Sequence, residues 1–453
     1  MKIAKVTPIF KKGNHLLPNN YRPISVLGHI NKIYEKLLFS RLSTHFNQNN
    51  SLYKYQYGFR EGHSTTHALV ELTDSLKNSI DNGNYACGIF IDLSKAFDTV
   101  NHDILIDKLK NYGISDNAIE LMKSYLEDRL QYVEINKTKS SLDKVTCGVP
   151  QGSVLGPLLF LIYINDLPNC CLTRKVRIFA DDTVIFFECD DPNQLSVIIE
   201  DILRHINDWF VANKLTMNVE KSNFCIFRSL KNKNKPIPES VPFNNYTMNR
   251  VPHIKYLGVF LDEHLSFTYH VNEVCKSLRK YFSIFYNIRR YLNKEHIKAI
   301  YYSMIYSKIQ YGLLTFGLTT AKNIKKIQTL QNKLLKVLTN QKYRTPTNDL
   351  HNSLDILKVK DILTQGILCF VHKYVNKKLP NVFDNYFKKF NEIHNLNTRN
   401  KDKFIAPKHR TVLGSKTIKH MGAVKWNILN QKIKEIRNVK GFRIFLKKNY
   451  IPY

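Results

Sequence analysis

Two adjacent carboxylates, Asp181 and Asp182, are the residues of this chain best suited to metal chemistry. Apolar, β-prone segments flank them at residues 176–179 and 184–187. This pattern predicts a strand, a tight turn with both acids, and a second strand. Two carboxylates at one point repel each other unless a cation is present, and hard oxygen ligands favour Mg²⁺. The turn is therefore a candidate seat for two-metal phosphoryl transfer, although most Asp-Asp pairs are solvated turns.

Two adjacent acids cannot enclose two cations, so a third carboxylate is needed from a neighbouring strand. Asp92 lies at the end of a β-prone run, residues 86–93, where a lone acid is costly unless it is paired or bound to metal. The alternative is that Asp92 caps the helix that follows.

A loop rich in glycine and proline lies between the two acid sites, at residues 148–157. Glycines let the backbone approach a ligand closely, and the apolar helix that the loop opens would present its N-terminus to phosphate. The alternative is an ordinary junction between a loop and a helix.

The charge of the chain indicates a polyanionic partner. Its 68 Lys and Arg against 37 Asp and Glu give a formal net charge of +31. Nucleic acid is the first candidate, and a ribosome-bound or membrane-surface protein is the alternative. The 25 Tyr and 26 Phe suit stacking on bases.

Cysteine usage and hydropathy exclude other classes of protein. The eight Cys show no zinc-ligand spacing, which indicates free thiols in a reducing compartment and an intracellular protein, with nucleus or cytoplasm left open. The longest apolar run, near residues 158–164, is far too short to span a bilayer, so no membrane partner is expected.

The pattern of elements predicts an α+β chain whose second half is helical and basic. Strands are expected at 1–13, 86–93, 132–135, 144–147, 221–228 and 254–261. Helices are expected at 31–46, 64–80, 103–112, 117–127, 155–166, 194–213, 271–287, 294–307, 323–339 and 356–376. Residues 229–252 and 388–420 are expected to be loops.

Three segments together resemble motifs A, B and C of reverse transcriptases: Asp92 to Phe97, Pro-Gln-Gly-Ser at 150–153, and Phe-Ala-Asp-Asp at 179–182. Their spelling resembles non-LTR retrotransposons, LINE-type and especially jockey-like. Residues 20–25 and 57–65 resemble two fingers motifs, 213–222 resembles motif D, and 256–259 resembles motif E, the primer grip. These seven motifs, in family order, cover about residues 5–261.

The resemblance implies a right-hand polymerase with an antiparallel-sheet palm. Residues 1–263 would form fingers and palm, 264–340 a helical thumb, and 341–453 a helical C-terminal extension. The basic helices of the second half would follow the phosphates of template and primer. The implied activity is RNA-directed DNA polymerisation, in which a DNA primer is extended with dNTPs on an RNA template. The oligomeric state is left open.

The resemblance also implies roles for individual residues. Asp92 and Asp181 would hold two Mg²⁺ ions, with Mn²⁺ as a substitute, and Asp182 would lie beside them. Phe97 would be the steric gate against ribonucleotides, or else an aromatic residue of the core. The remaining assignments are Gln151 and Gly152 at the incoming nucleotide, Lys11 and Arg22 at its triphosphate, Lys221 at the pyrophosphate unless it is simply solvated, and Tyr256, Leu257 and Gly258 in the primer grip.

The chain also departs from the family pattern. LINE-type proteins usually carry an upstream endonuclease, whereas this chain begins inside the fingers and shows no RNase H acid set or zinc knuckle, so we expect a truncated copy or a partial gene model. Two other hypotheses are kept. One is a decayed copy that only binds nucleic acid. The other is an RNA-templated RNA polymerase, against which Phe97 speaks.

Overall fold

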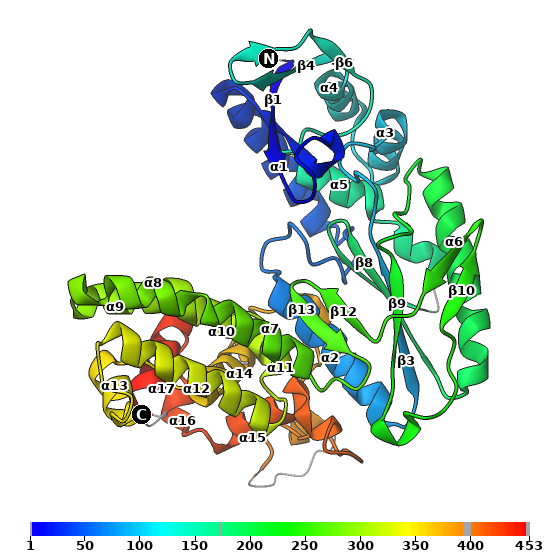
Figure 1. Cartoon of the computed structure of the whole chain (residues 1–453). Helices are drawn as coiled ribbons and strands as arrows, with labels where there is room; N and C mark the ends of the chain where they lie inside the picture. Colours follow the sequence, from blue (N-terminus) through cyan, green and yellow to red (C-terminus); the bar gives the residue numbers. More distant parts are fainter. Residues whose placement is uncertain (1, 172–173, 393–399, 450–453) are drawn as a thin grey trace.

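The computed structural model describes residues 2–171, 174–392 and 400–449. Figure 1 shows an N-terminal part with β1, β4 and α1, a central sheet that contains β3, β8 and β9, and a helical part formed by the second half of the chain. The expected α+β class, with helices dominating after the sheet, is confirmed.

The central sheet has four antiparallel strands in the order β7-β8-β3-β9. Their bounds are Lys175–Phe179, Asp182–Cys189, Tyr85–Ile91 and Asn223–Phe227. Side chains of β3 alternate between two apolar clusters, with Cys87, Ile89 and Ile91 in one and Ala86 and Phe90 in the other. Because successive side chains of a strand point to opposite faces, the sheet is covered on both sides.

Helices pack on both faces of the central sheet. One face packs against α3 (His102–Asn111), α5 (Gly156–Ile164) and α6 (Leu195–Ala212), with α4 (Asp116–Leu126) beside α3. The other face packs against α2 (Thr65–Asp81). Since α5 is apolar on every side, it is buried along its whole length.

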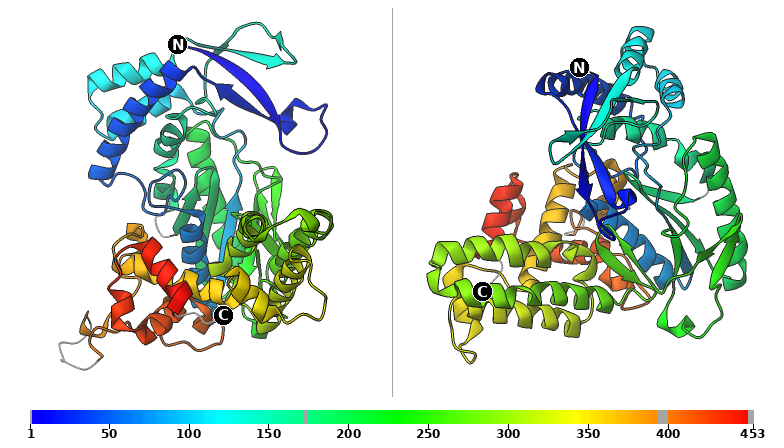
Figure 2. Two further views of the ribbon diagram at one scale, coloured as in Figure 1. Left: turned by 90° about the vertical axis from the view of Figure 1, so that its left-hand side faces the viewer. Right: turned by 45° about the horizontal axis from the view of Figure 1, so that its top comes forward.

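A second sheet forms the N-terminal part. Strands β1 (Ile3–Phe10) and β2 (Tyr21–Val26) make a long antiparallel hairpin, and β4 (Arg129–Ile135) runs parallel to β1. Strands β5 (Thr138–Lys139) and β6 (Asp143–Val145) pair with β4. The hairpin projects as a ribbon beside α1 (His29–Gln48) (Figure 2).

Two predictions about residues 229–261 were wrong. The expected loop contains a hairpin of β10 (Ser240–Phe243) and β11 (Tyr246–Asn249). The expected single strand is a second hairpin, β12 (His253–Tyr256) and β13 (Val259–Asp262). Its turn is Leu257-Gly258, both with positive φ, 42° and 79°, as the tightest hairpin turns require.

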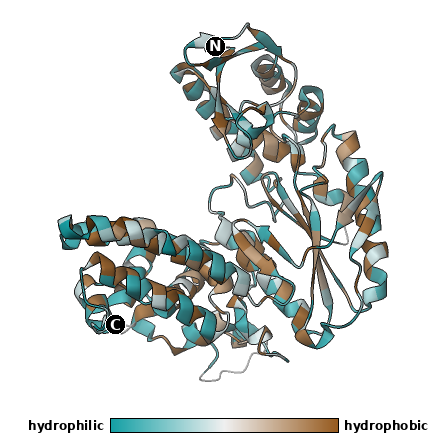
Figure 3. Cartoon of the chain, viewed as in Figure 1, coloured by the Kyte–Doolittle hydropathy of each residue, from teal (hydrophilic) through white to brown (hydrophobic). Residues whose placement is uncertain are grey.

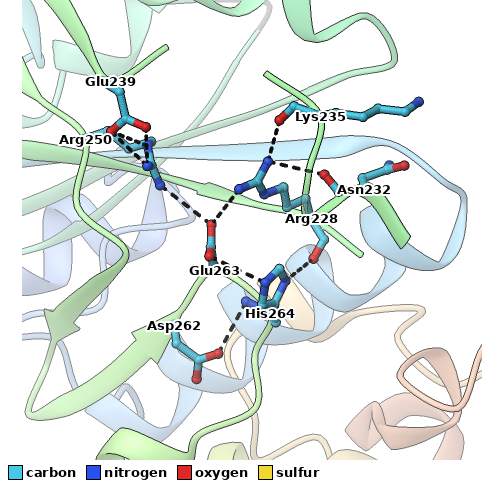
Figure 4. A network of polar contacts seen from close by, with 8 residues as sticks. All are labelled: Arg228, Asn232, Lys235, Glu239, Arg250, Asp262, Glu263 and His264. Carbon is cyan, nitrogen blue, oxygen red and sulfur yellow. Dashed lines mark hydrogen bonds and ion pairs between the residues drawn. The ribbon is translucent and has the colours of Figure 1, made fainter. Parts of the chain in front are cut away.

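A polar network ties the base of the β12–β13 hairpin to the end of β9 (Figure 4). The Glu263 carboxylate lies 3.2 Å from an Nη of Arg228 and 3.6 Å from one of Arg250. His264 Nδ1 lies 3.0 Å from the carbonyl oxygen of Arg228, and Arg250 also pairs with Glu239 at 2.6 Å. These contacts fix the base of the β12–β13 hairpin beside the end of β9.

The second half of the chain is helical, as predicted. Its helices are α7 (Thr268–Arg279), α8 (Tyr281–Ile288), α9 (Lys294–Ile300), α10 (Ser307–Gln310), α11 (Leu313–Phe316), α12 (Ala321–Leu338), α13 (Thr347–Leu354), α14 (Val359–Val375), α15 (Ile418–Ile428), α16 (Gln431–Lys434) and α17 (Val439–Asn449). A π-helical turn, Tyr301–Tyr306, joins α9 to α10. Apolar and polar residues alternate along these helices (Figure 3), and one apolar cluster runs from α2 through to α17.

Buried polar contacts attach the C-terminal helices to α2. The Asp74 carboxylate accepts hydrogen bonds from Ile418 N (3.1 Å) and Lys419 N (3.0 Å) at the start of α15. Lys77 Nζ donates to the Lys416 carbonyl at 2.7 Å. These contacts anchor the expected C-terminal extension to the layer that covers the central sheet.

The loop expected at residues 388–420 is mostly irregular, with short 3-10 turns at Phe390–Glu392 and Gly414–Lys416 and α15 beginning at Ile418, while residues 393–399 of that prediction lie outside the described residues. Within the part of the chain that the structure describes, no helix combines the length and the hydropathy needed to cross a membrane.

Candidate active site

The expected acidic turn is present at the tip of the β7–β8 hairpin. Phe179 pairs with Asp182, so Ala180 and Asp181 form the turn between them. On the other side of β8, Ile91 pairs with Thr183, which places Asp92, one residue beyond Ile91, opposite Asp182. The fold thus brings the three predicted carboxylates, Asp92, Asp181 and Asp182, to one edge of the central sheet.

These carboxylates influence one another electrostatically. Desolvation, with the charge of Asp92 as a further cause, raises the pKa of Asp181 above its usual range. Asp182 is exposed to solvent on one side. Even so, its pKa is raised to about 6, first by desolvation from the surrounding protein atoms and then by the charges of Asp181 and Asp92. A cluster of this kind favours a bound cation, which would relieve the repulsion.

The donor chemistry of this edge fits a hard divalent cation. All three side chains offer carboxylate oxygens, and Mg²⁺ binds through one or two protein carboxylates together with phosphates of a substrate. Within the described ranges, no group of three or more His, Cys, Asp or Glu side chains lies close enough together to hold a metal ion, so a metal site at these three carboxylates stays a prediction.

The two predicted fingers cations, Lys11 and Arg22, influence Asp181 electrostatically. Arg22 lies on β2 opposite Ile9, and Lys11 follows β1, its N–H bonded to the Asn20 carbonyl at 2.8 Å. Both cations are exposed. Arg22 and Lys11 each lower the pKa of Asp181, opposing desolvation. The β1–β2 hairpin therefore carries positive charge toward the acidic turn from a distant part of the sequence.

The glycine-rich loop at residues 148–157 contacts the β1–β2 hairpin. The Ser25 N–H donates to the Gln151 carbonyl at 2.7 Å. Gly152 has a φ of +108°, and a Cβ there would lie 2.8 Å from the Ser25 carbonyl oxygen. Only glycine accepts both the backbone angle and this approach.

The Gln151 side chain is held by a residue to which the sequence analysis gave no role. Its Nε2 donates to both carboxylate oxygens of Asp98, at 2.9 and 3.0 Å. Burial raises the pKa of Asp98, and the hydrogen bond from Gln151 opposes this shift. The available signal was the presence of Asp98 directly after Phe97, in the same motif as Asp92.

Phe97 is half-buried within an aromatic group. Its ring stacks on Phe160 of α5 with centroids 4.6 Å apart and meets Phe59 edge-on at 6.1 Å. These contacts fix the ring within an aromatic group, and the expected role of Phe97 as a steric gate stays a prediction.

A cavity of about 370 Å³ connects the acids to the predicted primer grip. Asp92, Asp182 and Lys221 line it together with Tyr256 and Leu257. Lys221 Nζ lies 3.4 Å from an oxygen of Asp92, so this lysine is an ion-pair partner of the acid.

The turn of the predicted primer grip is held by a residue that the sequence analysis missed. The hydroxyl of Tyr311, which follows α10, donates to the Leu257 carbonyl at 2.6 Å. A Cβ at Gly258 would lie 3.0 Å from the Tyr311 ring. No sequence signal linked two positions so far apart, because their contact depends on how the helical part packs against the β12–β13 hairpin.

Comparison with known proteins agrees with this arrangement. Residues 9–261 match the family described as "Reverse transcriptase (RNA-dependent DNA polymerase)". The chain is 30% identical over 385 residues to the probable RNA-directed DNA polymerase from transposon BS of Drosophila melanogaster, which covers 80% of this chain and 41% of that protein. It is 29% identical over 373 residues to the RNA-directed DNA polymerase from mobile element jockey of the same species, covering 80% and 40%.

A solved structure of telomerase from Candida tropicalis aligns with a TM-score of 0.44 at 12% identity, covering 83% of this chain and 66% of that one. The chain spans about two fifths of the length of the curated relatives named above, 41% and 40%. The jockey-like resemblance seen in the motifs is confirmed by these relatives. Since the family match covers residues 9–261, more than half of the 453, the chain belongs to the reverse transcriptase family.

Proposed function

We propose that this chain is an RNA-directed DNA polymerase of a non-LTR retrotransposon, which extends a primer 3′-hydroxyl with dNTPs on an RNA template. The observation that carries the proposal is the meeting of Asp92, Asp181 and Asp182 at one sheet edge, in a chain of the reverse transcriptase family. The formal net charge of +31 supports a nucleic-acid partner.

Asp92 and Asp181 would hold two Mg²⁺ ions, or Mn²⁺ in their place, with Asp182 beside them. Bound there, such ions supply activation of the primer hydroxyl and neutralise charge on the transferred phosphate. Lys11 and Arg22, on the β1–β2 hairpin, would bind the triphosphate as it approaches the turn.

The other predicted residues would shape the nucleotide and primer sites. Phe97 would exclude a ribose 2′-hydroxyl with the edge of its fixed ring. Gln151 and Gly152 would line the incoming nucleotide, with Gln151 held by Asp98. Lys221, which is ion-paired to Asp92, would donate a proton to departing pyrophosphate.

Tyr256, Leu257 and Gly258 would hold the primer end, because Tyr256 and Leu257 line the same cavity as Asp92 and Asp182. We assign residues 1–263 to fingers and palm, 264–340 to the thumb and 341–453 to a C-terminal extension. The contacts of Asp74 and Lys77 with residues 416–419 support an extension that acts as one body with the palm.

A primer-extension assay tests the proposal. The purified chain is incubated with a DNA primer on an RNA template, dNTPs and Mg²⁺, and elongation should stop when EDTA removes the metal. Replacing dNTPs with rNTPs should reduce incorporation strongly, and equal use of both would favour an RNA-templated RNA polymerase instead.

A second candidate function is binding of nucleic acid without catalysis, by a decayed copy. It is favoured by the strong basic charge, which binds a polyanion with or without catalysis. Binding of RNA that weakens steeply with salt, with no incorporation by correctly folded protein, would support this candidate and reject the polymerase.

A further inference from the structure

A buried glutamine lies directly behind the acidic turn. Gln56 is 2% exposed and belongs to a segment that runs along the free edge of β7. The Tyr57 N–H donates to the Ile178 carbonyl at 2.8 Å, and the Ile178 N–H donates to the Tyr55 carbonyl at 3.0 Å. The backbone of this segment is thereby fixed to the strand that leads into the turn.

The side chain of Gln56 reaches the turn itself. Its Oε1 accepts a hydrogen bond from Ala180 N at 3.2 Å and another from Gly58 N at 2.9 Å. Because both partners are backbone N–H groups, only the oxygen of the amide can face them, which settles the orientation of the side chain.

Ala180 needs such support. Its φ of +56° lies in the left-handed region, which costs a residue with a Cβ about 1–2 kcal/mol. Conformations of this kind persist only where the surroundings hold them. Since Ala180 precedes Asp181 and Asp182, the angle that it adopts sets the direction in which both carboxylates point.

Gly58 makes the contact possible. A Cβ at this position would lie 2.4 Å from Ala180 N, so any other residue would push the turn away. The turn is therefore held from one side by a close backbone and by one amide oxygen, both from the segment that precedes α2.

We propose that Gln56 is a positioning residue: its amide oxygen holds the Ala180 N–H and so fixes the acidic turn for catalysis. The catalytic consequence rests on the proposed polymerase function, whereas the hold on the turn does not. Gln56 itself would touch neither substrate nor metal.

Hydrogen exchange and kinetics together test this role. Gln56→Met keeps the length of the side chain but removes the acceptor, and Gln56→Asn keeps the amide but is one methylene too short. Gln56→Glu keeps an acceptor at the right length. Gln48→Met, on the exposed end of α1, is the matched control.

In the Gln56→Met and Gln56→Asn variants, we expect the Ala180 amide to exchange about tenfold faster, which corresponds to the free energy of one lost hydrogen bond. The exchange is followed in peptides that span residues 176–186. Glu should restore slow exchange. The kcat of primer extension should fall about tenfold in the Met variant, with KM for dNTP and primer unchanged, because positioning affects the reacting groups and not the binding surfaces.

Unchanged exchange at Ala180 in both the Met and the Asn variants would overturn the proposal. A large rise in KM at constant kcat would also overturn it, because it would indicate a binding role. If exchange rises as expected but even the wild-type chain extends no primer, the hold on the turn stands and the proposed polymerase function fails. If Gln56→Met does not fold, the Asn variant gives the same decision.

Discussion

Arg177 and Glu71 form a buried ion pair between the acidic hairpin and α2, and breaking it should destabilise the protein strongly. Arg177 lies on β7, two residues before Phe179, and is fully buried. Its Nη2 donates to Glu71 Oε1 at 2.9 Å and to Ser75 Oγ at 2.9 Å, and its Nε bonds the second Glu71 oxygen. The guanidinium also lies 4.9 Å from the ring centroid of Phe186.

The loss in free energy of unfolding depends on which charged groups each substitution leaves buried. Glu71→Ala leaves a buried guanidinium without its counter-charge, which costs about 3–5 kcal/mol. Replacing both partners, Arg177→Met with Glu71→Leu, leaves no charge in an apolar setting and should recover most of that loss. The double variant should therefore be more stable than the single Glu71→Ala variant, although it carries more substitutions.

Urea unfolding followed by circular dichroism measures these differences. Glu120→Ala, which breaks the exposed pair with Lys123 on α4, is the control and should cost about 0.5 kcal/mol or less. If Glu71→Ala costs no more than Glu120→Ala, or if the double variant is less stable than the single one, the reasoning about this buried pair is refuted.

Three further predictions concern the site and its supports. Phe97→Val should raise incorporation of rNTPs relative to dNTPs by an order of magnitude or more, measured as the ratio of kcat/KM values, and an unchanged ratio would leave Phe97 as a core aromatic only. Tyr311→Phe removes the hydrogen bond to the Leu257 carbonyl and should raise KM for the primer about fivefold, the equivalent of about 1 kcal/mol, while KM for dNTP stays constant. Burial, and to a smaller extent the charge of Lys255, lowers the pKa of His270 from 6.5 to about 4. Between these two pH values the unfolded chain therefore binds a proton at His270 and the folded chain does not. The free energy of unfolding should fall as the pH drops from 6.5 to 4, by up to about 3 kcal/mol for this group. His270→Gln should flatten that part of the curve of unfolding free energy against pH, and an unaltered slope would contradict the assigned shift.

The sequence predicted the central sheet and its acids because local signals were strong there. Apolar, β-prone segments on both sides of Asp181 and Asp182 indicate a hairpin, and β3 shows a buried run that ends just before Asp92. The long helices were predicted for the same reason, since α12 carries a clear apolar stripe of which Ile327, Leu330, Leu334 and Leu338 are buried.

Features that depend on contacts between distant segments were not predictable in this way. The turn at Leu257-Gly258 lies within a mostly apolar run, so the sequence looks like one strand where the structure has two. The hold of Gln56 on Ala180 and of Tyr311 on Leu257 joins residues 124 and 54 positions apart. Such pairs are set by tertiary packing, and a single sequence carries no local pattern for them.

The central claim is that the carboxylates at the edge of the β7–β8 hairpin carry polymerisation. The most direct measurement is the single-turnover rate of dNTP addition to an RNA-templated DNA primer by wild type, Asp181→Asn and Asp190→Asn. Asp190 is the matched control, because it is an exposed acid that directly follows Cys189, the last residue of β8. We expect Asp181→Asn to lower the rate about a thousandfold or more, with binding of primer and template retained and Asp190→Asn equal to wild type. Equal rates for Asp181→Asn and wild type would contradict the account.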